Sequence, residues 1–155
     1  MRITTKGRYG LRALLNLAMS AETKPVPIKT IAEEEGISPE FLEQIFFKLR
    51  KSGIIDSVRG PGGGFIIKRP LEEISIKDIF DAVEEDLGIT PCTEDETKTG
   101  PELCSKAETC LLHGIWQETA THLRNYFASI SLKDLISKAQ KELYDNIQSG
   151  QDFSI

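Results

Sequence analysis

The sequence predicts a mainly α-helical protein with one small β-hairpin, on two observations. Apolar residues recur at three- and four-residue spacing over most of the chain, which is the period of an amphipathic helix. Around residues 54–67, two runs rich in Ile, Val and Phe instead flank a glycine-rich stretch, as in a hairpin. At 155 residues with 39% hydrophobic content, the chain can bury one compact core and carry an assembly element besides.

Three helices are expected before the hairpin. The first spans about residues 7–21, and prolines end it. The second stops near Gly36, where glycine can adopt the left-handed conformation that terminates a helix, and its glutamate run at residues 33–35 is expected to face solvent. The third begins at Ser38 and Pro39, because serine caps free backbone N–H groups and proline fits the first turn.

The hairpin has a basic, glycine-rich tip at residues 59–64, which read Arg-Gly-Pro-Gly-Gly-Gly. Such a tip lets the backbone approach another surface closely, and Arg59 can bind phosphate or enter a narrow minor groove. The run lacks the Gly-Lys-Ser/Thr ending of a nucleotide-binding loop. Two helices joined by a tight turn and followed by a basic hairpin predict a winged helix-turn-helix, a DNA-binding domain.

The charge is segregated along the chain, although the net charge is −5. Residues 1–70 hold twelve Lys and Arg against seven Asp and Glu, a net charge of +5, whereas residues 71–155 carry −10. A basic first half is typical of a module that binds a polyanion. An unevenly charged surface without a binding role is the alternative on charge alone.

The second half is expected to hold a loop and long helices. A capping box at Ser75 and Asp78 opens a short helix that ends by Gly88 and Pro91, and a polar, acidic stretch follows it. A long helix then buries an apolar face, and a last helix restarts near Ser131. The apolar residues of the long helix are Trp116, Ala120, Leu123 and Phe127. We expect a homodimer interface here, with packing onto the chain's own winged helix as the alternative.

The expected domain organisation has four parts. Residues 1–84 form the winged helix-turn-helix domain, 85–114 the cysteine-containing loop, 115–148 the C-terminal dimerisation helices and 149–155 a flexible tail. No apolar run reaches the roughly 18 residues of a membrane span, and no secretory pattern opens the sequence. A cytoplasmic protein without membrane contact is expected.

Three cysteines and a histidine form the pattern C-x11-C-x5-C-x2-H, at Cys92, Cys104, Cys110 and His113. Thiolates and an imidazole suit zinc or a cluster with two iron atoms, but the spacing matches no common zinc finger. Redox-active thiols and buried cysteines are alternatives. Cys110 and His113 also resemble a nucleophile and its base, yet no residue that would orient the histidine is evident, so no enzyme is expected.

Several segments resemble one known family. Residues 1–9, Leu42-Glu43-Gln44, Leu49-Arg50-Lys51 and above all residues 57–64 are similar to the IscR-type regulators, iron-sulfur members of the Rrf-type winged-helix transcription factors. The resemblance implies a homodimer on pseudo-palindromic promoter DNA, with one 2Fe-2S cluster per monomer. By position, it implies the ligands Cys92, Cys104, Cys110 and His113.

The first cysteine gap departs from the family, because it is six residues longer than the second. A related nitric-oxide sensor holds a 4Fe-4S cluster on three cysteines and a non-histidine ligand. A related repressor of cysteine metabolism lacks the ligands. A nitric-oxide sensor and a cluster-free or zinc-binding, thiol-responsive repressor are therefore the alternative functions.

The expected DNA contacts divide into base contacts and phosphate contacts. Glu43 and Gln44 are assigned to base edges, and Arg59 to the minor groove. The phosphate contacts are assigned to Arg2, Lys6, Arg8, Lys48 and Lys51, and Ser38, Glu40 and Gly60 complete the set. Glu40 can accept a hydrogen bond from a cytosine amino group but repels phosphate. The resemblance also implies that Glu43 disfavours one class of site until the cluster is present.

Overall fold

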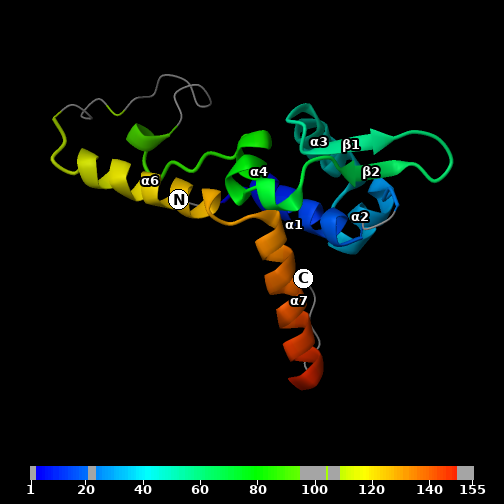
Figure 1. Ribbon diagram of the computed structural model, residues 1–155. Helices are drawn as coiled ribbons and strands as arrows, with labels where there is room; N and C mark the ends of the chain where they lie inside the picture. Colours follow the sequence, from blue (N-terminus) through cyan, green and yellow to red (C-terminus); the bar gives the residue numbers. More distant parts are fainter. Residues whose placement is uncertain (1–2, 21–23, 95–103, 105–108, 150–155) are drawn as a thin grey trace.

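The computed structural model describes residues 3–20, 24–94, 104 and 109–149 (Figure 1). Its first three helices are α1 (Thr5–Ser20), α2 (Ile28–Glu35) and α3 (Pro39–Lys51). They pack on one another around fully buried side chains that include Leu14, Ile31, Leu42, Phe46 and Leu49. The mainly helical fold class with a small hairpin wing is confirmed.

The turn between α2 and α3 follows from its sequence. Gly36 has φ 64° and ψ 36°, the left-handed conformation predicted for it. Ser38 then caps α3, because its Oγ accepts a hydrogen bond from the backbone N of Phe41 at 3.3 Å, and Pro39 occupies the first turn. The helix-turn-helix thus forms where it was expected.

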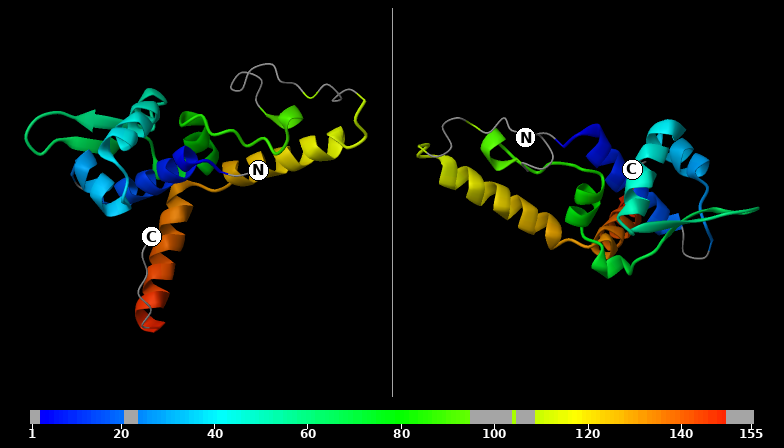
Figure 2. Two further views of the ribbon diagram at one scale, coloured as in Figure 1. Left: turned by 180° about the vertical axis from the view of Figure 1, so that it is seen from behind. Right: turned by 90° about the horizontal axis from the view of Figure 1, so that it is seen from above.

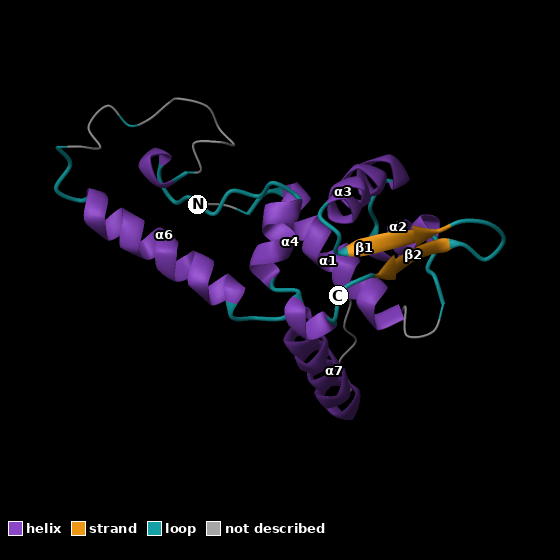
Figure 3. Ribbon diagram, turned by 45° about the horizontal axis from the view of Figure 1, so that its top comes forward, coloured by secondary structure: helices purple, strands orange, loops and turns teal. Residues whose placement is uncertain are grey.

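The wing is the antiparallel pair β1 (Ile55–Val58) and β2 (Gly64–Ile67), with Ile55 opposite Ile67 (Figure 3). Gly60 and Gly62 turn the chain at positive φ, 97° and 74°. The wing is anchored to α3 by an edge-to-face contact of Phe65 with Phe46, whose ring centroids lie 4.9 Å apart.

The prediction that the glutamate run of α2 faces solvent holds for Glu33 and Glu34, which are exposed, but is wrong for Glu35. Glu35 is buried, with 7% of its surface exposed, because the last turn of α2 faces α1. The Arg12 guanidinium lies 2.9 Å from its Oε2, and the Asn16 side chain donates to its Oε1 at 3.0 Å. These partners compensate the carboxylate for the water it loses on folding.

After the wing come η1 (Leu71–Glu73) and α4 (Ile76–Ala82). The predicted capping box is present, since the Ser75 backbone N donates to Asp78 Oδ2 at 2.9 Å and the Asp78 N donates to Ser75 Oγ at 3.1 Å. The helix ends well before Gly88, because Glu84 adopts a left-handed φ of 58°. A short turn, η2 (Pro91–Thr93), follows in a segment that was expected to be irregular.

Two long helices complete the fold, α6 (His113–Ala128) and α7 (Leu132–Ser149). Figures 1 and 2 show α6 extending from α4 to one side, whereas α7 leaves α1 and η1 in another direction. Within the described α6, Ala120 alone is buried, and Ile115 and Tyr126 are 51% and 60% exposed. No helix in the described ranges is long and apolar enough to cross a membrane.

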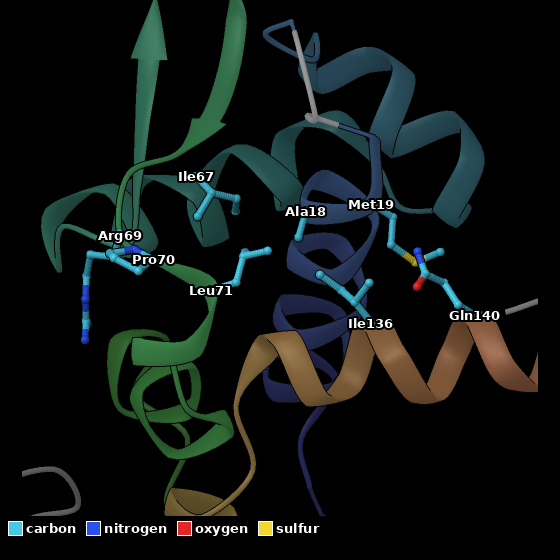
Figure 4. Close-up of a pocket in the computed structure, with 8 residues that line it drawn as sticks. All are labelled: Ala18, Met19, Ile67, Arg69, Pro70, Leu71, Ile136 and Gln140. Carbon is cyan, nitrogen blue, oxygen red and sulfur yellow. The ribbon is translucent and has the colours of Figure 1, made fainter.

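A cavity of about 300 Å³ lies where α7 meets the winged helix (Figure 4). It is lined by Ala18, Met19, Ile67, Arg69, Pro70, Leu71, Ile136 and Gln140. Arg69 points away from it and donates to the Glu73 carbonyl at 2.6 Å. The remaining lining is mostly apolar, so this cavity is a gap in the packing between α7 and the winged helix.

Candidate nucleic-acid interface and cysteine segment

The exposed face of α3 gathers several predicted DNA contacts. Glu40, Glu43 and Gln44 are all exposed, and they line a shallow hollow of about 500 Å³ together with Phe47 and Lys48. Residues three and four apart share one face of a helix, which is why these side chains come together. Ser38 is exposed directly before this helix.

Two of the predicted phosphate contacts meet at Glu84. The Lys48 Nζ lies 2.5 Å from Glu84 Oε2, and the Lys6 Nζ donates to the Glu84 carbonyl oxygen at 3.1 Å. The hydrogen bond and the positive charge of Lys48 hold the pKa of Glu84 below its ordinary value of 4.5. Glu84 therefore stays ionised at neutral pH and holds the side chain of Lys48 in an ion pair.

The other predicted contacts lie apart from this hollow. Arg59 and Gly60 are exposed at the tip of the wing, which extends away from α3 (Figure 1). Lys51 is exposed at the end of α3, and Arg8 is exposed on α1, where it donates to Thr5 at 3.3 Å. Arg2 lies outside the described residues.

Cys92 lies in η2, which is fastened to α6. Gln117 donates from its side chain to the Cys92 carbonyl at 3.1 Å, and Arg124 donates to the Thr93 carbonyl at 2.6 Å. The Thr90 hydroxyl lies 3.2 Å from the Cys92 sulfur. These bonds place Cys92 against α6, although it is 25 residues from Gln117 in the sequence.

His113 begins α6 on the face that holds η2, because it precedes Gln117 by four residues. Cys110 lies just before the helix, and its carbonyl accepts from the His113 N at 3.1 Å. The His113 Nδ1 is buried and has no hydrogen-bond partner among the described residues. An unsatisfied buried nitrogen costs about 1–3 kcal/mol, so this imidazole suits a ligand role.

The four predicted ligands are not gathered into one site. All three cysteines have free thiols, and Cys104 is exposed. Among the described residues, no three His, Cys, Asp or Glu side chains lie close enough together to hold a metal ion. The structure does bring Cys92 close to the face of α6 that begins at His113.

Glu84 and Glu85 connect the segment that leads to Cys92 with the helices α1 and α3. Glu85 is 2% exposed, and its Oε1 accepts from the Thr4 backbone N at 2.8 Å, while its Oε2 accepts from the Thr4 hydroxyl. The segment leading to Cys92 is therefore tied to the start of α1 and, through Glu84, to α3. The sequence gives no local signal for this link, because Glu84 adopts its left-handed φ without being a glycine.

The helix-turn-helix formed by α2 and α3, followed by the β1–β2 wing, defines a winged-helix DNA-binding protein. The chain belongs to the Rrf2 family of iron-dependent transcriptional regulators, whose family model matches residues 3–138.

Relatives agree with this assignment. The chain is 38% identical to the HTH-type transcriptional regulator IscR of Photorhabdus laumondii over 140 residues, which are 90% of this chain and 82% of that protein. Among solved structures it resembles T. potens IscR, with TM-score 0.72, 29% identity and coverage of 92% and 90% of the two chains. It also resembles CymR (YrzC), the global cysteine regulator of B. subtilis, with TM-score 0.70, 28% identity and coverage of 89% and 98%.

Proposed function

We propose that this protein is a cytoplasmic, homodimeric transcription regulator that senses iron-sulfur cluster status. It binds pseudo-palindromic promoter DNA through α3 and the wing, and each monomer holds a 2Fe-2S cluster on Cys92, Cys104, Cys110 and His113. The observation that carries the proposal is the buried Nδ1 of His113, which has no hydrogen-bond partner among the described residues and belongs to the helix to which the Cys92 segment is bonded.

The residues around these ligands suit a cluster. The Thr90 hydroxyl lies beside the Cys92 sulfur, and such hydrogen bonds tune a bound cluster. Cys110 lies three residues before His113, so both would approach a cluster from the start of α6. When bound, a 2Fe-2S cluster supplies a redox-active cross-link among its ligands. Cys104 would join that link from the loop between the other two cysteines.

In the proposed complex with DNA, α3 and the wing contact the grooves, and a separate set of cationic side chains contacts phosphates. Gln44 and Glu43 would contact base edges from the exposed face of α3, while Arg59 and Gly60 reach the neighbouring groove from the wing. Lys6, Arg8, Lys48 and Lys51 would hold phosphates, as would Arg2. A salt bridge to Glu84 restrains Lys48 in the free protein.

A path of bonded residues supports coupling between the cluster segment and the DNA-binding face. It runs from Gln117 to η2, along the chain to Glu85 and Glu84, and then to Lys48 on α3. Cluster binding at Cys92 and His113 would shift Glu84 relative to Lys48 and so change the positive charge that α3 presents to DNA.

The dimer part of the proposal rests on α6. Its exposed apolar side chains Ile115 and Tyr126 have nothing to cover them in the described part of a single chain. A second copy of α6 would bury them, and a dimer would match the symmetry of a pseudo-palindromic site.

DNA binding with and without the cofactor tests the proposal. Duplexes selected by the anaerobically purified protein from a random library would be titrated with that protein and with the Cys92→Ala/Cys104→Ala/Cys110→Ala variant. We expect both to bind DNA and to differ in affinity or site preference. Identical affinity and preference would contradict a sensing role, and a wild-type protein that selects no sequence would contradict base recognition.

A cluster-free regulator of cysteine metabolism is the second candidate, favoured by the structural similarity to CymR. It would purify colourless, and its DNA binding would respond to thiol oxidation or to a small thiol metabolite. Zinc without inorganic sulfide would indicate the zinc-binding form of this alternative.

A further inference from the structure

Phe47 is a large apolar side chain that the fold leaves exposed. It is 60% exposed on α3, although its neighbour Phe46 is fully buried against Phe65. Among the described residues, Phe47 is neither in the buried core nor one of the partly buried side chains packed against it.

The surroundings of Phe47 are those of the proposed base-reading surface. It follows Gln44 by three residues and Glu43 by four, so the three side chains share one face of α3. It lines the same hollow as these residues, in which every other lining side chain is polar or charged. On this otherwise polar face, the ring is the one lining side chain that offers an apolar surface to a base edge.

We propose that Phe47 contacts the 5-methyl group of a thymine in the major groove and so determines part of the sequence preference. This inference rests on the proposed DNA-binding function. The thymine methyl is an apolar group on the major-groove edge of a base pair, and phenylalanine is among the side chains that contact it.

The neighbouring residue supports a thymine as the partner. Gln44 has the amide group that pairs with adenine N6 and N7, and an A·T pair presents its methyl group in the same groove. The carboxylates of Glu40 and Glu43 disfavour a phosphate beside this face, whereas an uncharged methyl group meets no such repulsion.

The test compares thymine with deoxyuridine, which lacks the methyl group alone. Each thymine of a duplex selected from a random library by the wild-type protein would be replaced in turn. At one position per half-site, we expect wild-type binding to weaken about fourfold, the ratio that corresponds to burying one methyl-sized group. Phe47→Ala should bind thymine and deoxyuridine there equally, and Phe47→Leu should retain part of the difference.

Lys51→Ala provides the matched control on the same helix. It should weaken binding to both duplexes alike and lower the salt dependence by about one unit of slope, whereas Phe47→Ala should leave that slope unchanged. If no methyl group matters to the wild type, or if Phe47→Ala keeps the discrimination, the inference is wrong even though DNA binding stands. Phe47→Ala binding as tightly as wild type would likewise contradict a contact between the ring and DNA. If the wild type selects no sequence at all, the proposed function itself fails.

Discussion

The Nζ of Lys48 lies 2.5 Å from Oε2 of Glu84, so α3 is bonded to the segment that leads to Cys92. In the proposed complex, a DNA phosphate competes with Glu84 for this lysine. Glu84→Gln should therefore tighten DNA binding by about two- to fivefold, the range expected for one exposed ion pair. Titration of a labelled duplex at fixed salt measures the change.

A charge-matched control separates this local effect from net charge. Glu72→Gln removes one exposed negative charge from η1, where no ion pair with Lys48 is recorded. It should change affinity less than Glu84→Gln, and in the Lys48→Ala background Glu84→Gln should lose most of its effect. Equal effects of the two glutamine variants would contradict direct competition.

The same ion pair predicts a pH dependence. The pKa of Glu84 is lowered by Lys48, so its contribution to stability is complete above the ordinary value of 4.5 and is lost as the pH falls through the lowered pKa. Lys48→Met should move the Glu84 pKa upward and should destabilise the protein at neutral pH more than in acid. NMR titration of the side-chain carboxyl carbons measures the pKa directly.

Asp134 provides an internal control in that titration. Hydrogen bonds from Ser131 lower the pKa of Asp134, and Lys48 is not among the causes. Its midpoint should be the same in both proteins. A shift at Asp134 as large as that at Glu84 would point to a general change of the fold.

A substitution at Gly7 should disturb the junction at Glu85. A Cβ atom at residue 7 would lie 2.6 Å from the Glu85 Oε2, which forces the buried carboxylate away from Thr4. Gly7→Ala should therefore destabilise the protein by about 1–3 kcal/mol, the cost of an unsatisfied buried group. Denaturant unfolding measures this difference.

Gly114→Ala is the matched control for that experiment. A Cβ at this helical position meets no atom within 4 Å, so alanine should leave stability unchanged or raise it by up to about 1 kcal/mol. If Gly7→Ala proved as stable as Gly114→Ala, the Glu85 contact would have no role in the fold.

The bonds between η2 and α6 should affect retention of the cofactor. Gln117→Ala and Arg124→Met each remove one bond to the Cys92 segment, and loss of such supporting contacts costs about 10–100-fold in metal affinity. Loss of visible absorption after addition of a chelator measures retention. Glu118→Ala, on an exposed position that pairs with His122, should behave as wild type. Unchanged retention in both test variants would argue against Cys92 as a ligand.

Local chemistry predicted much of the fold, and long-range contacts account for what it missed. The left-handed turn at Gly36 and the Ser38 cap depend on neighbouring residues, so their sequence signals are strong. The burial of Glu35 depends on Arg12, 23 residues away, and no helical pattern within α2 reveals it.

In the candidate site, too, local spacing predicts one part and long-range contacts determine the other. The spacing of Glu43, Gln44 and Phe47 predicts that they share one face of α3. Phe47 lies outside the buried stripe of that helix, which is formed by Leu42, Ile45 and Leu49. The attachment of Cys92 to α6 could not be predicted from spacing, because it depends on side chains 25 and more residues further along.

The most direct test of the account is iron and inorganic sulfide analysis of the anaerobically purified full-length protein, together with its visible absorption spectrum. We expect about two iron atoms and two sulfide ions per chain, and their loss from a folded His113→Ala variant or from the triple cysteine variant. Zinc without sulfide, no metal at all, or a cluster with four iron atoms that survives in His113→Ala would contradict the proposed 2Fe-2S site.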